Sequence, residues 1–245
     1  MNRSIELLKQ TQGTVFKNKD GVESRLTLLP PIPSAEIEAL QQRIPCPLPQ
    51  AVRELLEFSR GFEGTPFDIR FGGSDGGFGL EEIFPYPVDI AADGCGNFWV
   101  VDLLKHSTDW GPIFYACHDA PVIVYQAETL DHFIEEVIKS AKSPWQSEIS
   151  EVHGDLSYHI WHKNPGVLTH SQCVTSSDGS LQAFAGTLDE SWEFIDLRRP
   201  KLGDGFSWGR YGSRTTNRRF GEERIFAYQK KTLGQKFLNA FRLKP

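Results

Sequence analysis

The sequence predicts an α+β fold. Two helical segments bounded by prolines come first, and a long run of short apolar stretches cut by glycine and proline follows them. A third helical segment then lies near the middle of the chain. Apolar residues at helical spacing, and turn residues between short apolar stretches, are the two observations that support this prediction. With 39% apolar and 24% charged residues, the chain can bury a core and stay soluble.

The first two helices are marked by their boundary residues. Ser34 is a suitable N-cap, because its hydroxyl can accept a backbone N–H. Pro45 and Pro47 end this helix, since proline lacks an N–H and clashes with the preceding turn. Pro49 suits the first turn of a second helix, and Gly61 suits the left-handed position after it. Apolar residues at helical spacing predict the buried face of this second helix: Val52, Leu55, Leu56 and Phe58.

Strands and turns are predicted after the second helix. Short apolar runs there are separated by Gly, Pro and Asp-Gly, which indicates strands and tight turns. We expect strands at residues 98–103, 113–117 and 121–125. A helix is expected from about Leu130 to Ala141, because apolar residues there recur at helical spacing.

The remaining residues predict a mostly β extension. Asp178-Gly179 lies between two short segments and predicts a hairpin turn, and the stretches SWEFIDL and RIFAYQ predict strands. The last residues predict a terminal helix with one apolar face, formed by Leu233, Phe237 and Phe241. We therefore divide the chain into three parts: an N-terminal arm (1–29), an α+β domain (30–142) and a β-rich extension with a terminal helix (143–245).

Charge is distributed unevenly along the chain. The net charge is −6, but residues 198–245 hold 13 Lys and Arg against three acidic residues. The arginines there alternate with aromatic residues, a combination that single-stranded nucleic acids can bind. We favour the interpretation that this basic region pairs with the acidic rest of the chain or with a partner. Nucleic-acid binding through residues 198–245 stays as an alternative.

The sequence indicates a cytoplasmic protein without membrane contact. No apolar run approaches the roughly 18 residues that a membrane helix needs, and the N-terminus lacks the apolar stretch of a secretory signal. The four cysteines form no C-x-x-C pair, so buried free thiols in a reducing compartment are expected.

Catalytic and cofactor motifs are missing from the sequence. There is no G-x-S-x-G, no H-E-x-x-H and no phosphate-binding Gly-Lys-Ser/Thr loop. Cys117, His118 and Asp119 are adjacent, but neighbouring residues of a strand point to opposite faces. We therefore assign no catalytic residue, no cofactor and no metal ligand. A metal-dependent enzyme stays as an alternative that would use the four histidines of one segment: His153, His159, His162 and His170.

An ordered set of short motifs accompanies these elements. In chain order its residues are Leu48, Pro49, Gly61, Asp93, Gly94, Gly96, Asn97, Gly111, Pro112, His118 and Asp119. This set, with the helices around it, resembles the SUKH superfamily, which includes yeast regulators of cell-wall assembly and killer-toxin resistance. The resemblance covers roughly residues 30–142.

The resemblance implies both a fold and a role. The expected fold is a curved antiparallel sheet with packed helices. The expected role is that of a bacterial, non-enzymatic immunity protein that binds and neutralises a partner toxin, with a nuclease as the expected toxin. An acidic surface would complement the basic face of a nuclease. The candidate partner-binding acids are Glu81, Glu82, Asp89 and Asp102. A regulatory scaffold without a toxin partner is the other function that the resemblance allows.

Overall fold

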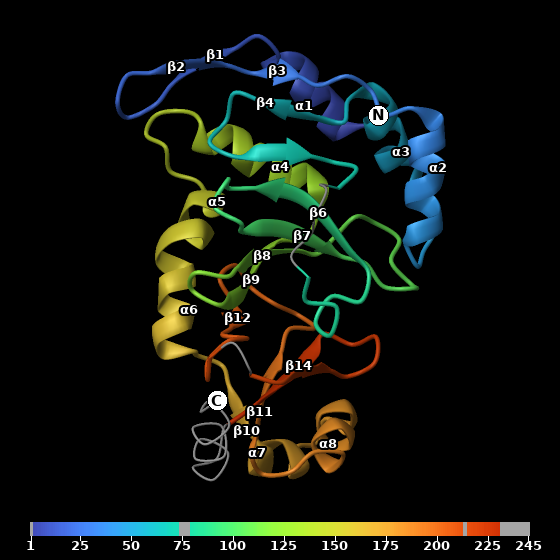
Figure 1. Cartoon of the computed structure of the whole chain (residues 1–245), viewed down its shortest axis with the longest axis vertical. Helices are drawn as coiled ribbons and strands as arrows, with labels where there is room; N and C mark the ends of the chain where they lie inside the picture. The colour runs from blue at the N-terminus through green and yellow to red at the C-terminus, as the bar shows by residue number, and fades with distance from the viewer. Residues whose placement is uncertain (1, 74–78, 213–214, 231–245) are drawn as a thin grey trace, which may run out of the picture.

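A computed structural model describes residues 2–73, 79–212 and 215–230, and its centre is an eight-stranded antiparallel sheet (Figure 1). The sheet is open, and the predicted α+β fold is confirmed. Its strands, in spatial order, are β12 (Gly205–Phe206), β9 (Val122–Ala127), β8 (Ile113–Cys117), β7 (Phe98–Asp102), β6 (Pro87–Ala92), β5 (Asp68–Arg70), β4 (Gly61–Glu63) and β3 (Thr27–Leu28).

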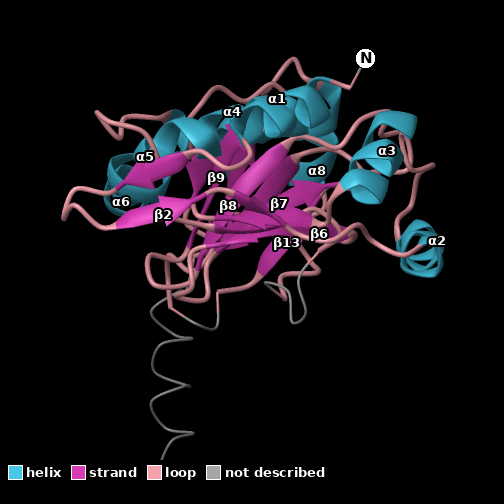
Figure 2. Ribbon diagram, turned by 90° about the horizontal axis from the view of Figure 1, so that it is seen from above, coloured by secondary structure: helices cyan, strands magenta, loops and turns pink. Residues whose placement is uncertain are grey.

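Helices cover one face of this sheet, as Figure 2 shows for α1 and α4. The helices of this layer and its border are α1 (Arg3–Thr11), α2 (Ser34–Arg43), α3 (Gln50–Phe58) and α4 (Leu130–Ser140). The predicted N-cap of α2 is wrong: Ser34 is the first residue of the helix, and Pro33 is the N-cap. No side chain caps this end, and the carbonyl of Pro33 accepts the first backbone N–H groups.

The N-terminal segment opens with the short helix α1 and packs into the fold. Arg3 of α1 forms an ion pair of 2.7 Å with Glu135 of α4, and Leu8 is fully buried in the core. Strand β3 is one edge of the large sheet. A short hairpin lies between these two elements and consists of β1 (Val15–Lys17) and β2 (Glu23–Arg25).

Both faces of the central strands are buried. In β8, Ile113 and Tyr115 belong to the core under the helices, whereas Phe114 and Ala116 belong to a second core on the opposite face. All residues of β8 and β9 are buried. This explains why these strands are continuous apolar runs in the sequence, without the alternation typical of a sheet with one face in water.

The extension builds the second core. Its own four-stranded sheet contains β10 (Leu168–Thr169), β11 (Trp192–Asp196), β14 (Ile225–Gln229) and β13 (Asn217–Arg219), in that order. Phe226 and Tyr228 of this sheet pack against Phe206 of β12, with ring centroids 5.2 and 6.2 Å apart. Because β12 pairs with β9, the extension also adds a strand to the large sheet.

The extension is more helical than the sequence suggests. Asp178-Gly179 is not a hairpin turn: Asp178 caps α8, its carboxylate accepting the N–H of Leu181 at 3.0 Å. The helical elements of the extension are α5 (Glu148–Glu151), a π-helical turn η1 (Val152–Leu156), α6 (Ser157–Lys163), α7 (His170–Val174) and α8 (Gly179–Gly186). The predicted terminal helix with Leu233, Phe237 and Phe241 lies outside the described residues.

The motif residues form turns at the ends of strands. Asp93 accepts hydrogen bonds from the N–H groups of Cys95 and Asn97 and from the Asn97 side chain. Asn97 in turn accepts the N–H of His118 at 2.9 Å, which ties the two motifs together. Only glycine fits at position 111, because a Cβ there would lie 1.8 Å from the carbonyl oxygen of Glu128. These motif residues therefore fix local geometry at both ends of β8: Asp93, Asn97 and His118 at its end, and Gly111 before its start.

Candidate protein-binding surface

An acidic turn, residues 80–84, carries the two exposed acids of the predicted set. The N–H groups of Ile83 and Phe84 donate to the carbonyl of Leu80 at 3.0 and 2.8 Å, which closes the turn. Ile83 and Phe84 are buried in the core between the two sheets, so Glu81 and Glu82 are held outward at the surface. Neither acid forms an ion pair with another described residue.

Arg219 of the extension holds the acidic turn in place through a hydrogen bond to its backbone. Its guanidinium donates to the carbonyl of Ile83 at 2.9 Å and binds both carboxylate oxygens of Asp102, at 2.7 and 3.0 Å. Arg224 adds a bond of 2.7 Å to the same carboxylate. The Asp102 side chain is only 1% exposed, so these two arginines compensate a fully buried charge.

Asp102 and Asp89 are buried, unlike the other two predicted acids. Asp102 lies inside the contact between the two parts of the chain. Asp89 is 5% exposed and lies against the groove described next. Glu81 and Glu82 are the members of the predicted set that the structure places at the surface.

A groove of about 840 Å³ begins where the acidic turn ends, at Pro85 and Tyr86. It lies between α2, the end of β5 and the start of β6. Apolar and charged side chains share its lining, among them Ile32, Leu40, Arg43, Arg60 and Val88. This mixture suits contacts with protein side chains, because interfaces combine an apolar centre with a polar rim.

The arginine-rich region is largely engaged within the fold. Arg198 forms ion pairs with Asp178, Asp196 and Glu223 at 2.7, 2.6 and 3.1 Å. Burial raises the pKa of Asp196, but the bond from Arg198 brings that pKa below its usual value, and the same guanidinium lowers the pKa of Asp178. With Arg219 and Arg224 on Asp102, these pairs support the interpretation that the basic region pairs with the chain's own acids. Arg214 lies outside the described residues.

The four histidines of the metal-enzyme alternative do not converge. His153 lies 3.1 Å from Asp93 and packs on the ring of Trp99, whereas His170 lies 3.1 Å from the carbonyls of Ala185 and Leu188. His159 and His162 lie on α6. The contact between His153 and Asp93 joins the extension to the motif turn. Hydrogen bonds from Asn97, Cys95 and His153 lower the pKa of Asp93, although its burial raises it.

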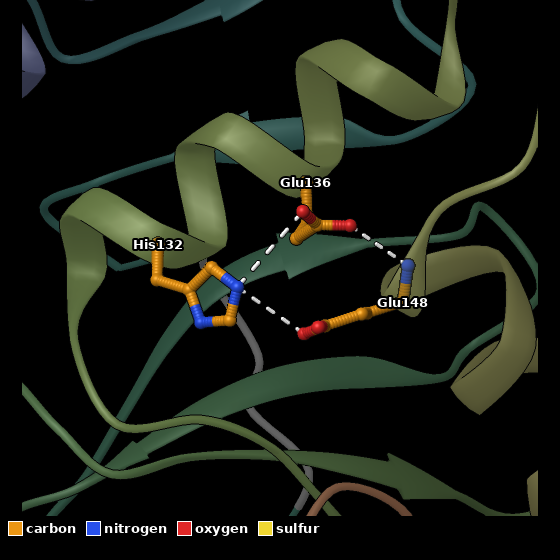
Figure 3. Close-up of side chains that lie close together, drawn as sticks. All are labelled: His132, Glu136 and Glu148. Atoms are coloured by element: carbon orange, nitrogen blue, oxygen red, sulfur yellow. Dashed lines mark hydrogen bonds and ion pairs between the residues drawn. The ribbon is translucent and has the colours of Figure 1, made fainter.

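A different cluster brings three possible metal ligands together, and the sequence analysis missed it. His132 lies 3.9 Å from Glu136 and 3.2 Å from Glu148, as Figure 3 shows. Both oxygens of the buried Glu136 are already bound, one by Lys139 at 2.6 Å and one by the N–H of Glu148 at 2.8 Å. The cluster therefore fastens α5 to α4. The i,i+4 pair of His132 and Glu136 was visible in the sequence, but the position of Glu148 was not.

Cys117 is separated from His118 and Asp119 by the end of β8. Cys117 is buried in the core under the helices, and burial raises the pKa of its thiol. His118 and Asp119 lie at the exposed turn, 3.3 Å apart. Of the four cysteines, all of them free, Cys95 is exposed and the others are buried.

Fold and surface together define an α+β protein with an exposed acidic turn beside a mixed apolar and charged groove. Among the described residues, no helix is both long and apolar enough to cross a membrane. The model of the SMI1 / KNR4 family (SUKH-1) matches residues 31–136, from the start of α2 into α4. This part of the chain therefore matches the family that the sequence resembles, which confirms the resemblance. No curated protein and no solved structure matches the chain.

Proposed function

We propose that this protein is a non-enzymatic immunity protein that binds and neutralises a partner toxin, and that the toxin is a nuclease. The observation that carries the proposal is the SUKH-1 match over residues 31–136, a family consistent with immunity-type proteins. The acidic turn supports it, because Glu81 and Glu82 are exposed and form no ion pair with another described residue.

The acidic turn and the groove would act together. A nuclease has a basic face that binds phosphates, and an acidic surface steers association with such a face and competes with its substrate. The turn would meet the basic face first, while the adjoining groove would accept apolar and polar side chains of the toxin. Arg219 and the buried Ile83 and Phe84 would keep the two acids in position before binding, which reduces the entropic cost of association.

Co-purification tests the proposal. The tagged chain is expressed in its native host, or with a neighbouring gene for a large secreted protein, and whatever stays bound after a salt wash is identified. A single toxin domain in near-equal amount, with its nuclease activity suppressed, is the expected result. Recovery of nucleic acid or metal without a protein partner would contradict the proposal.

Charge reversal then tests the acidic turn. Glu81→Lys/Glu82→Lys should slow toxin association about tenfold or more at low salt, and the difference should shrink as salt screens the charges. Asp20→Lys/Glu23→Lys is the matched control, because both residues are exposed on the distant β1–β2 hairpin. Equal association rates for the two variants would exclude the acidic turn from the interface.

A further inference from the structure

Helix α6 carries an exposed aromatic patch formed by Tyr158, Trp161 and His162. Tyr158 is 62% exposed and Trp161 is 38% exposed. The His162 ring lies between them, with centroids 4.0 Å from Tyr158 and 4.7 Å from Trp161. The patch lies outside the segment that the family model matches. Tyr and Trp are enriched among the residues that contribute most to binding at protein interfaces. An exposed Tyr and Trp on one helix therefore form a candidate binding surface.

The patch is held rigidly by the other side of α6. Ser157 and Ile160 are buried, and Asn164 ends the helix in the left-handed conformation. The Asn164 side chain accepts the N–H of Ser207 at 3.0 Å and donates to the hydroxyl of Tyr228. Figure 1 shows α6 along the outside of the molecule, where its exposed face is accessible. Binding to this face would need little ordering of the protein.

Opposite charges flank the patch along the chain. Glu151 and Asp155 are exposed before it, and Lys163 is exposed after it. Arg210 adds positive charge at the same end by donating to the carbonyls of Trp161 and His162. Within residues 2–73, 79–212 and 215–230, no ion pair engages Glu151, Asp155 or Lys163. Asp155 and Lys163 are eight residues apart, about 12 Å along a helix, so they are too distant to neutralise each other.

We propose that this patch is the interface of a two-fold dimer, in which α6 of one copy lies antiparallel to α6 of a second copy of the chain. A two-fold axis places the same surface on both sides, so a surface with opposite charges at its ends complements itself. Asp155 of each copy then faces Lys163 of the other, and Tyr158 and Trp161 stack between them. Acids at one end make the patch less suitable for nucleic acid, since they repel phosphates.

Sedimentation velocity of the full chain tests the dimer. One short helix per copy buries less than a standard interface, so a dissociation constant in the micromolar range is expected, and a concentration series from about 1 to about 300 µM covers it. Trp161→Ala should weaken the dimer about tenfold or more. Val22→Ser is the control, because Val22 is likewise an exposed apolar residue, at 62%, but lies on the distant hairpin turn. A monomer at all concentrations, or a dimer that Trp161→Ala leaves unchanged, overturns the proposal.

A charge exchange tests the antiparallel orientation. Asp155→Lys and Lys163→Glu should each weaken the dimer about tenfold, because each variant places like charges opposite one another twice. The double variant should restore it, and the restoration must occur between copies, given the distance between these residues within one chain. Circular dichroism confirms that each variant is folded. A double variant that stays monomeric overturns the orientation, as does a patch that binds single-stranded oligonucleotide while the chain remains monomeric. The experiment needs no toxin, so it is independent of the proposed immunity function.

Discussion

A single residue, Asp102, joins the segment matched by the family model to the extension. Its carboxylate is 1% exposed and receives bonds from Arg219 and Arg224, which follow it by more than a hundred residues in the chain. Removing one partner of a buried ion pair leaves the other partner charged and without compensation. This is strongly destabilising, even where replacing the whole pair by apolar residues would cost little.

Asp102→Ala should lower the free energy of unfolding by about 3–5 kcal/mol. Urea denaturation followed by tryptophan fluorescence measures the change. Lys105→Ala is the control, because the ion pair of Lys105 with Glu222 is exposed and should contribute little to stability. Equal effects of the two substitutions would show that the buried cluster contributes no more to stability than an exposed ion pair does.

Acid should destabilise the protein in part through Arg198. In the unfolded chain Asp178 and Asp196 titrate near pH 3.9, whereas in the folded protein their pKa values are lower. Their contribution is thus fully present above about pH 4 and is lost as the pH falls through the folded-state pKa values, because the unfolded chain binds protons first. Arg198→Gln should therefore lose less stability between pH 7 and pH 3 than the unsubstituted protein does. Urea midpoints across this range measure the difference, and parallel curves would contradict the prediction.

The sequence identified Glu81 and Glu82 as candidate acids, but it showed neither the turn that carries them nor the arginine that supports this turn. Glu81 and Glu82 are exposed, although the neighbouring Ile83 and Phe84 are buried. Asp102 and Asp89 look the same in sequence, yet both are buried. Their environment depends on residues distant in the chain, and a single sequence does not show which arginine reaches which acid.

At the scale of elements, local signals predicted the structure where packing agrees with them. The predicted strand over 113–117 matches β8, and the predicted helix near 130–141 matches α4. The prediction of a hairpin turn at Asp178-Gly179 was wrong because an Asp-Gly pair occurs in two kinds of structure. It suits a two-residue hairpin turn, but aspartate is also a strong N-cap, and the tertiary contacts of α8 decide in favour of the helix.

Strand β12 is the element that connects the extension to the large sheet. It is two residues long, so its attachment depends on Phe206, which is fully buried between β9 and the small sheet. Phe206→Ala should cost about 3–5 kcal/mol, because the aromatic ring leaves a cavity in the second core. Denaturation measures this cost, and hydrogen exchange should quicken at the amides of β9. Unchanged exchange there would contradict the role assigned to β12.

The whole molecule depends on both faces of the central sheet being covered. We propose that residues 30–142 do not form an independent domain, because the extension covers an apolar face of β7, β8 and β9 that includes Val100, Phe114 and Ile123. A large exposed apolar face promotes association.

A fragment of residues 1–142 should therefore be aggregated or only partly folded when expressed alone. Size-exclusion chromatography and near-UV circular dichroism measure this, with the full chain as the control. A monomeric fragment with native-like near-UV signals would show instead that the first 142 residues fold independently.

The two outermost strands of the large sheet, β12 and β3, contain two residues each. A long unpaired edge invites a strand from another chain, which is a common beginning of fibrils and of swapped assemblies. Here the backbone groups available at either edge are too few to template such an addition. We therefore expect the large sheet, within the described residues, to resist extension by a strand from another molecule.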